Sequence, residues 1–173
     1  GPGVRKDAVR KDLTALIDLA PTFAEIAGAQ MLVQSDGRSL LPLLGRRWPG
    51  QTWRKSLLLE HYAAPNQEQN ETLSEALEPP DPGDVQQEAL EQPPTDYVGL
   101  RTAKYKYIQR IGAARELYDM VKDPYELDNQ WQNADPQFQE ELRVFMESYR
   151  TCAAETCRDI DALQPPVYRL NKG

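Results

Sequence analysis

The stretch YVGLRTAKYKYIQRIGAARELYDM, residues 97–120, decides the fold class of this chain. It contains three short runs rich in aromatic, β-branched and other apolar residues, at 97–102, 105–110 and 116–118. The connections between these runs, Thr-Ala-Lys and Ile-Gly-Ala-Ala, have the length and composition of hairpin loops. The pattern therefore predicts three consecutive antiparallel strands.

A fourth strand is predicted upstream, in WRKSLLLEHY, residues 53–62. Its centre, Leu57 to Leu59, is a continuous apolar run, which is typical of a strand buried on both faces. Within the KYKYI segment, alternation places Tyr105 and Tyr107 on one face, with Lys104, Lys106 and Ile108 on the other. The expected sheet has about four antiparallel strands.

A C-terminal helix is predicted in DPQFQEELRVFMESYRTCA, residues 135–153. Asp135 is a suitable cap, and Pro136 takes the first helical position, where its missing N–H is tolerated. Its apolar positions form one stripe: Phe138, Leu142, Phe145, Met146 and Tyr149. This helix is expected to pack on the sheet.

A shorter amphipathic helix is predicted near the N-terminus, between Asp18 as N-cap and Gly28 as the residue after the C-cap. Leu19, Phe23 and Ile26 then fall on one helical face. Together with the sheet and the C-terminal helix, this pattern predicts an α+β fold.

Residues 63–96 interrupt this pattern with six prolines, nine acidic residues and no lysine or arginine. Such a tract buries too little apolar surface to offset its ordering entropy. We predict an acidic, proline-rich insertion loop between two strands. Asn70 begins an N-x-[ST] pattern inside it, a possible glycosylation acceptor in a secreted protein.

Charge and hydropathy exclude two classes of partner. The net charge of −7 and pI of about 4.8 argue against nucleic acid, which requires a basic footprint. No apolar run approaches the roughly 20 residues of a membrane-spanning helix.

The two cysteines, Cys152 and Cys157, have a C-x₄-C spacing. Zinc would need two further nitrogen or sulfur ligands, and the chain has one histidine, His61, so a zinc site is disfavoured. The spacing alone leaves open a local disulfide or two reduced thiols near a helix end.

Several linked segments resemble, in order and spacing, the C-terminal third of the sulfatase family. They are LIDLAPTFAEIAGA (16–29), DGRSLLPLL (36–44), YVGLRTAKYKYI (97–108) and ELYDMVKDPYELDN (116–129). The ending CAAETCR, residues 152–158, resembles the branch of N-acetylglucosamine-6-sulfatases, where a short-spaced cysteine pair lies near the end of the protein.

This resemblance implies the C-terminal subdomain of the alkaline-phosphatase-like sulfatase fold. Residues 1–50 would end the main domain, and residues 51–173 would form the subdomain, with 63–96 as its insertion. The resemblance favours a Cys152–Cys157 disulfide and an exported, periplasmic, extracellular or lysosomal location. It also makes 116–129 an architectural corner, in which Glu126 and Asn129 satisfy backbone groups of the loop.

Sulfatases hydrolyse sulfate esters with a formylglycine, made in a C/S-x-P-x-R stretch, and a calcium ion held by oxygen ligands. Neither cysteine begins such a stretch, and the Asp128-Asn129 pair lies in the corner rather than at a metal site. The resemblance therefore implies that the nucleophile and the calcium ligands belong to an N-terminal catalytic part. This chain alone is expected to hold no catalytic residue, metal or cofactor.

The resemblance implies a sulfated sugar or glycosaminoglycan as substrate, and the best local candidates to contact it are His61, Glu60 and Arg101. Arg101 has a fork suited to sulfate or carboxylate, whereas Lys104 and Lys106 are weaker candidates. The alternative for His61 is a structural role, as a partly buried residue hydrogen-bonded near Glu60 or to the backbone. Two other functions remain open: a stand-alone carbohydrate-binding module, or a structural segment that exposes an apolar patch around Leu19 and Phe23.

Overall fold

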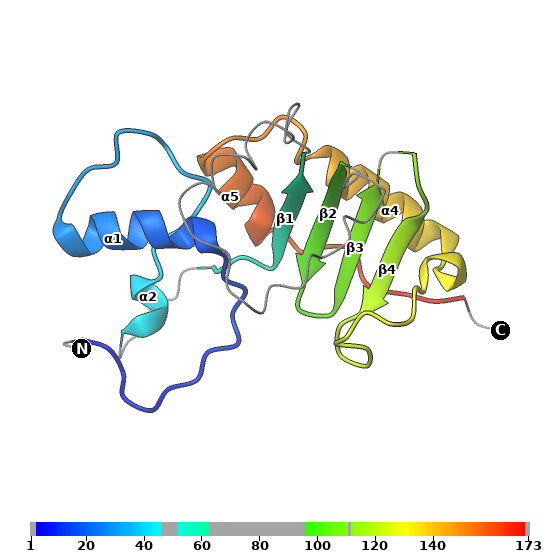
Figure 1. Ribbon diagram of the computed structural model, residues 1–173, viewed down its shortest axis with the longest axis horizontal. Helices are drawn as coiled ribbons and strands as arrows, with labels where there is room; N and C mark the ends of the chain where they lie inside the picture. Colours follow the sequence, from blue (N-terminus) through cyan, green and yellow to red (C-terminus); the bar gives the residue numbers. More distant parts are fainter. Residues whose placement is uncertain (1–2, 46–51, 63–95, 111, 172–173) are drawn as a thin grey trace, which may run out of the picture.

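The structure is a computed structural model that describes residues 3–45, 52–62, 96–110 and 112–171. A four-stranded antiparallel sheet with strand order β1-β2-β3-β4 forms its centre (Figure 1). The strands are β1 (Ser56–His61), β2 (Tyr97–Thr102), β3 (Tyr105–Arg110) and β4 (Arg115–Asp119). The helices are α1 (Leu19–Ala27), α2 (Leu41–Leu44), α4 (Pro136–Glu147) and α5 (Glu155–Ala162), with short 3₁₀ turns at Leu16–Asp18 and Trp131–Asn133. The α+β prediction is confirmed.

Two sequence predictions concern residues outside the described part. The insertion was predicted over 63–96, of which only Asp96 is described, and Asn70 lies outside the described residues. The division into 1–50 and 51–173 stays a prediction.

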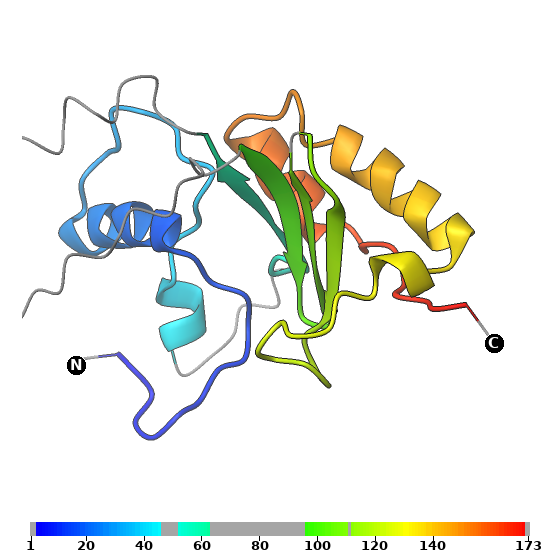
Figure 2. The same ribbon diagram turned by 45° about the vertical axis from the view of Figure 1, so that its right-hand side comes forward.

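One face of the sheet forms the hydrophobic core with α4. The strand register places Leu58, Leu100, Tyr107 and Leu117 in one row across the four strands. Leu100 and Leu117 are fully buried, and Tyr107 is 2% exposed. Full burial of such side chains contributes about 1.5–3 kcal/mol each relative to an exposed position. Helices α4 and α5 both lie on this side of the sheet (Figure 2).

Helix α4 begins and packs as predicted. Asp135 Oδ1 accepts a hydrogen bond from Phe138 N–H (3.0 Å), which satisfies one of the unpaired N–H groups of the first turn. Phe138 and Leu142 are fully buried, and the Phe138 ring meets Tyr105 edge to face at 5.5 Å. The apolar stripe therefore faces the sheet.

Helix α1 has its predicted ends, but Asp18 does not cap it with its side chain. Gly28 takes the left-handed conformation (φ 64°) that ends the helix. The carboxylate of Asp18 is fully buried and instead accepts hydrogen bonds from both terminal nitrogens of Arg54. Both carboxylate oxygens are occupied by Arg54 and by the backbone N–H groups of Ala15 and Arg38, so neither caps α1.

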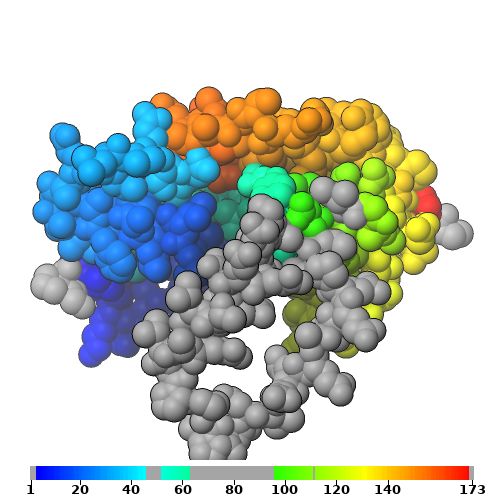
Figure 3. Space-filling model, turned by 45° about the horizontal axis from the view of Figure 1, so that its top comes forward, coloured from blue at the N-terminus to red at the C-terminus, as the bar shows by residue number. Residues whose placement is uncertain are grey.

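Helix α5 was missed by the sequence analysis, which assigned no helix to residues 155–162. The helix is short, and its N-cap, Ala154, has no side-chain acceptor and a φ of 50°. Tertiary contacts hold it: Arg158 Nη1 donates to the Ser35 carbonyl (2.5 Å) in the N-terminal segment. Figure 3 shows this blue N-terminal segment beside the orange C-terminal region.

The corner after β4 confirms the prediction for Asn129. Its Oδ1 accepts from Leu117 N–H (3.0 Å) and Trp131 N–H (3.0 Å), and its Nδ2 donates to the Arg115 carbonyl (3.1 Å). One side chain thus joins the two ends of the corner.

The prediction for Glu126 is wrong. Its carboxylate binds Lys106 Nζ at 2.6 Å rather than a backbone group of the loop. The backbone is satisfied by Asp123, whose two carboxylate oxygens accept from Leu127 N–H (3.0 Å) and Asp128 N–H (2.9 Å). Asp123 precedes Pro124, where an acidic side chain can bond forward along the turn.

Candidate functional site

The face of the sheet opposite α4, called here the second face, carries most of the predicted substrate-contacting residues. The strand register arranges its side chains in three rows. The first row is His61, Tyr97 and Arg110; the second is Leu59, Gly99, Ile108 and Glu116; the third is Leu57, Arg101, Lys106 and Tyr118. The middle row is apolar except for Glu116 at the β4 edge, and it lies between two rows that contain basic residues.

The first row is a stack of rings and a guanidinium group. The His61 and Tyr97 rings lie 5.4 Å apart at 16°, and the Arg110 guanidinium carbon lies 5.5 Å from the Tyr97 ring centre. Arg110 Nε also binds Glu116 Oε1 at 2.7 Å. Burial raises the pKa of Glu116, but hydrogen bonds from Arg110 and Tyr118 outweigh it, so the pKa lies below its ordinary value.

His61 has an unused polar atom in this row. Its Nε2 is buried and has no hydrogen-bond partner among the residues that the structure describes. Most buried polar side-chain atoms are hydrogen-bonded, so an unpaired one calls for an explanation. An external group could bond to Nε2 only if the side chain or its cover moved to expose this atom.

The third row contains Arg101 and Lys106. Burial lowers the pKa of Arg101, opposed by the charge of Glu126, and its Nη1 donates to the Thr102 carbonyl. Lys106 is occupied by Glu126, as described above. The guanidinium of Arg101 therefore retains more donor capacity than the ammonium of Lys106.

Glu60 lies apart from the other two candidates, on the α4 face of the sheet. Its Oε1 accepts from Tyr62 O–H (3.1 Å), and this bond raises the pKa of Tyr62. It borders a cleft with Arg115 and Arg150. The structure therefore brings His61 and Arg101 to one face and separates Glu60 from them.

Lys104, a weaker candidate, is not part of the three rows on the second face. Lys104 lies in the β2–β3 hairpin and is exposed. It borders a separate cavity that also contains Lys55.

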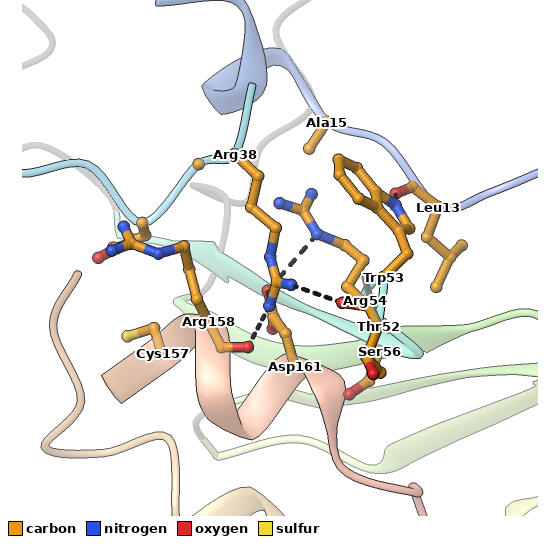
Figure 4. A network of polar contacts seen from close by, with 12 residues as sticks. Leu13, Ala15, Arg38, Thr52, Trp53, Arg54, Ser56, Cys157, Arg158 and Asp161 are labelled. Atoms are coloured by element: carbon orange, nitrogen blue, oxygen red, sulfur yellow. Dashed lines mark hydrogen bonds and ion pairs between the residues drawn. The ribbon is translucent and has the colours of Figure 1, made fainter. Parts of the chain in front are cut away.

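A buried polar network, absent from the sequence analysis, anchors the start of β1 (Figure 4). Arg54 is fully buried and donates to Asp18 Oδ2 (2.9 Å) and Oδ1 (2.7 Å). Its Nε lies 3.5 Å from Asp161 Oδ2 of α5. Arg38 and Arg54 both face the Trp53 ring, at 5.9 and 5.5 Å. The network joins three segments that are distant in sequence.

Asp161 extends this network to Tyr149, just after the end of α4. Tyr149 O–H donates to Asp161 Oδ1 (3.1 Å), and the same hydroxyl lies 2.9 Å from Ser56 Oγ, the first residue of β1. Burial raises the pKa of Asp161, while the neighbouring Arg54 charge opposes the rise. Burial likewise raises the pKa of Tyr149. These contacts fix the end of β1 opposite His61.

The predicted disulfide between Cys152 and Cys157 is present. Cys157 lies in the first turn of α5, and Cys152 follows α4 in the chain. The bridge therefore ties the first turn of α5 to the segment that follows α4.

The described residues do not fit a calcium ion. Within 3–45, 52–62, 96–110 and 112–171, no three His, Cys, Asp or Glu side chains are grouped so as to hold a metal. The Asn129 amide is already bonded on both sides to backbone groups.

Comparison with known proteins identifies a consistent set of relatives, although no protein-family model matches. The N-acetylglucosamine-6-sulfatase of Capra hircus is 29% identical over 175 residues, which are 95% of this chain and 31% of that protein. The chain thus spans about a third of the length of the curated relatives it matches.

Solved structures share the fold. A 2-O GAG sulfatase matches 99% of this chain and 31% of its own, with a TM-score of 0.58 and 25% identity. A protein in complex with its substrate D-glucosamine-2-N,6-O-disulfate matches 84% of this chain and 24% of its own, with a TM-score of 0.50 and 26% identity. A phosphonate monoester hydrolase from Silicibacter pomeroyi matches 90% of this chain and 28% of its own, with a TM-score of 0.57 and 25% identity.

The relatives and the fold agree with the resemblance seen in the sequence segments. The chain is similar over nearly its whole length to part of the N-acetylglucosamine-6-sulfatases, and its order of strands and helices is consistent with the C-terminal part of a sulfatase.

Proposed function

We propose that this chain is the C-terminal portion of a sulfatase that hydrolyses sulfate esters of a sulfated sugar or glycosaminoglycan. The observation that carries the proposal is similarity to N-acetylglucosamine-6-sulfatases over 95% of the chain. The neighbour whose substrate is D-glucosamine-2-N,6-O-disulfate supports a 6-sulfated glucosamine as the substrate class.

In this proposal the formylglycine and calcium belong to an N-terminal catalytic part that packs against this chain. The exposed apolar face of α1 supports such a partner, because Phe23 and Ile26 are each 63% exposed and Leu19 is 39% exposed. Apolar side chains grouped on one exposed helix face mark an interaction site more often than scattered ones do.

The second face would then contribute to substrate binding. His61 Nε2 would bond a sugar hydroxyl or a sulfate oxygen once a local movement exposed this buried atom, and the Arg101 fork suits a sulfate. Glu60, on the opposite face, would have to act at a different part of the substrate.

The proposed location is an exported, periplasmic, extracellular or lysosomal compartment. The Cys152–Cys157 disulfide supports it, because disulfides persist in oxidising compartments. Among the described residues, no helix has the length and apolar character needed to cross a membrane.

The test compares the isolated chain with the complete enzyme. The purified 173-residue chain, supplied with calcium, should release no sulfate from N-acetylglucosamine-6-sulfate. Co-expression with the catalytic part should give a stable complex that does release sulfate. Turnover by the isolated chain, or failure of the two parts to associate, would contradict the proposal.

A second candidate function is a stand-alone carbohydrate-binding module, favoured by the His61–Tyr97–Arg110 row. Aromatic rings and guanidinium groups are common in sites for anionic sugars. This function predicts that the isolated chain binds a sulfated oligosaccharide, and that His61→Ala or Arg101→Ala removes the binding. No measurable affinity in the isolated wild-type chain would exclude it.

A further inference from the structure

A cavity of about 290 Å³ lies at the end of the sheet opposite His61, and none of the functions above uses it. Its walls come from four parts of the chain: residues 11–13, residues 54–55, the β2–β3 hairpin, and residues 164–168. The interior is mainly apolar, with Leu13, Tyr105 and Val167 among its lining side chains.

Side-chain hydrogen bonds hold these walls in place. Trp53 Nε1 donates to the Leu13 carbonyl (2.7 Å), and Tyr105 O–H donates to the Pro166 carbonyl (3.1 Å). Thr102 Oγ1 accepts from both Lys104 N–H (3.1 Å) and Tyr105 N–H (3.0 Å), which fixes the hairpin. The cavity is therefore preformed, which lowers the entropic cost of binding a ligand.

Three lysines surround the cavity: Lys11, Lys55 and Lys104. All three are exposed, and none has an ion pair within the described part of the chain. The one acidic residue of the lining, Asp12, is already bound to Arg10 Nε at 3.0 Å. The buried Arg54 is offset by Asp18 and Asp161. A chain with a net charge of −7 thus presents a locally positive, apolar cavity.

We propose that this cavity binds an amphipathic organic anion, with a ring-sized apolar body and a sulfonate, sulfate or carboxylate group at the lysines. The volume lies near the lower limit of small-molecule sites, which suits one or two fused rings. A neutral sugar fits the mainly apolar lining poorly, because its hydroxyl groups would lose their hydrogen bonds with water.

The test titrates 2-naphthalenesulfonate into the full oxidised chain by isothermal titration calorimetry. The neutral isostere, 2-naphthalenemethanol, should bind more weakly, and added salt should weaken the sulfonate alone. Each Lys→Gln change should weaken sulfonate binding by about two- to fivefold, so the triple change at Lys11, Lys55 and Lys104 should weaken it at least about tenfold. The matched control, Lys122→Gln, removes an exposed lysine outside the cavity and should change nothing.

A second variant separates the cavity from the charge. Val167→Trp places a large side chain at a position that is 57% exposed, so it should fill the cavity without unfolding the chain. It should abolish binding with all three lysines intact, and circular dichroism checks the fold. The proposal would be overturned if the chain did not bind the sulfonate or bound the neutral probe equally well. It would also be overturned if the triple lysine variant or Val167→Trp kept the full affinity for the sulfonate.

Discussion

Replacing Arg54 by methionine should destabilise the chain more than any surface ion-pair change. The guanidinium and the Asp18 carboxylate are both fully buried and share two hydrogen bonds of 2.9 and 2.7 Å. Methionine fills much of the same volume but leaves the Asp18 carboxylate buried without its guanidinium partner, and Asp161 keeps only Arg38 (3.9 Å) as a positive neighbour among the described residues. Breaking a buried pair from one side typically costs 3–5 kcal/mol.

The reciprocal change, Asp18→Asn, should be milder. Arg54 would keep Asp161, whose Oδ2 lies 3.5 Å from its Nε. Asparagine keeps one oxygen, so it can still accept from one of the two backbone N–H groups that now bond to different oxygens of Asp18, Ala15 N–H to Oδ2 (2.8 Å) or Arg38 N–H to Oδ1 (2.9 Å). We therefore expect about 3 kcal/mol for Asp18→Asn, at the lower end of the range, and about 5 kcal/mol for Arg54→Met.

Urea unfolding, followed by tryptophan fluorescence and circular dichroism, measures these free energies. Arg143→Met is the matched control, because its pair with Glu140 is more than half exposed on both sides and should contribute less than about 1 kcal/mol. If Arg54→Met loses no more stability than Arg143→Met, or less than Asp18→Asn, the role assigned to the network is refuted.

Three further predictions concern the sheet and the corner. Asn129→Ala removes three backbone hydrogen bonds and should cost about 1–3 kcal/mol in urea unfolding, whereas the exposed Asn133→Ala should be near neutral. Gly99→Ala should cost about 1–3 kcal/mol or more, because a Cβ there would lie 2.4 Å from the Tyr107 carbonyl oxygen; unchanged stability would contradict that contact. The folded pKa of Glu116 is lowered below 4.5, so its stabilisation is present above pH 4.5 and is lost as the pH falls through the folded pKa. Glu116→Gln should therefore reduce the loss of unfolding free energy at acidic pH, as measured by urea unfolding at a series of pH values.

The sheet could be predicted from the sequence because its signals are local. The three strands of residues 97–119 follow one another through short loops, and the cap of α4 lies directly before its apolar stripe. The same local rule would have separated Glu60 from His61, since adjacent residues of a strand point to opposite faces. Grouping them by adjacency overlooked that alternation.

The polar network could not be predicted in this way. Arg54 and Asp18 are 36 positions apart, and Asp161 lies a further 107 positions beyond Arg54, so no periodic pattern connects them. Nothing distinguishes these charges from the exposed ones that dominate the chain. Helix α5 was missed for a related reason, because its stability comes from the disulfide and from contacts with the N-terminal segment rather than from a capping signal.

The network also bears on the candidate substrate-binding residues, because β1 connects them. Ser56, at one end of the strand, contacts Tyr149, and His61, at the other end, stacks on Tyr97. The register with β2 fixes both ends together, and a slip of one residue would turn His61 to the opposite face. A substitution of Arg54 should therefore change the packing of His61 at the other end of β1. A substitution of Lys106 should leave the pairing of β1 with β2 intact. The position of His61 thus depends on contacts made at the far end of its own strand.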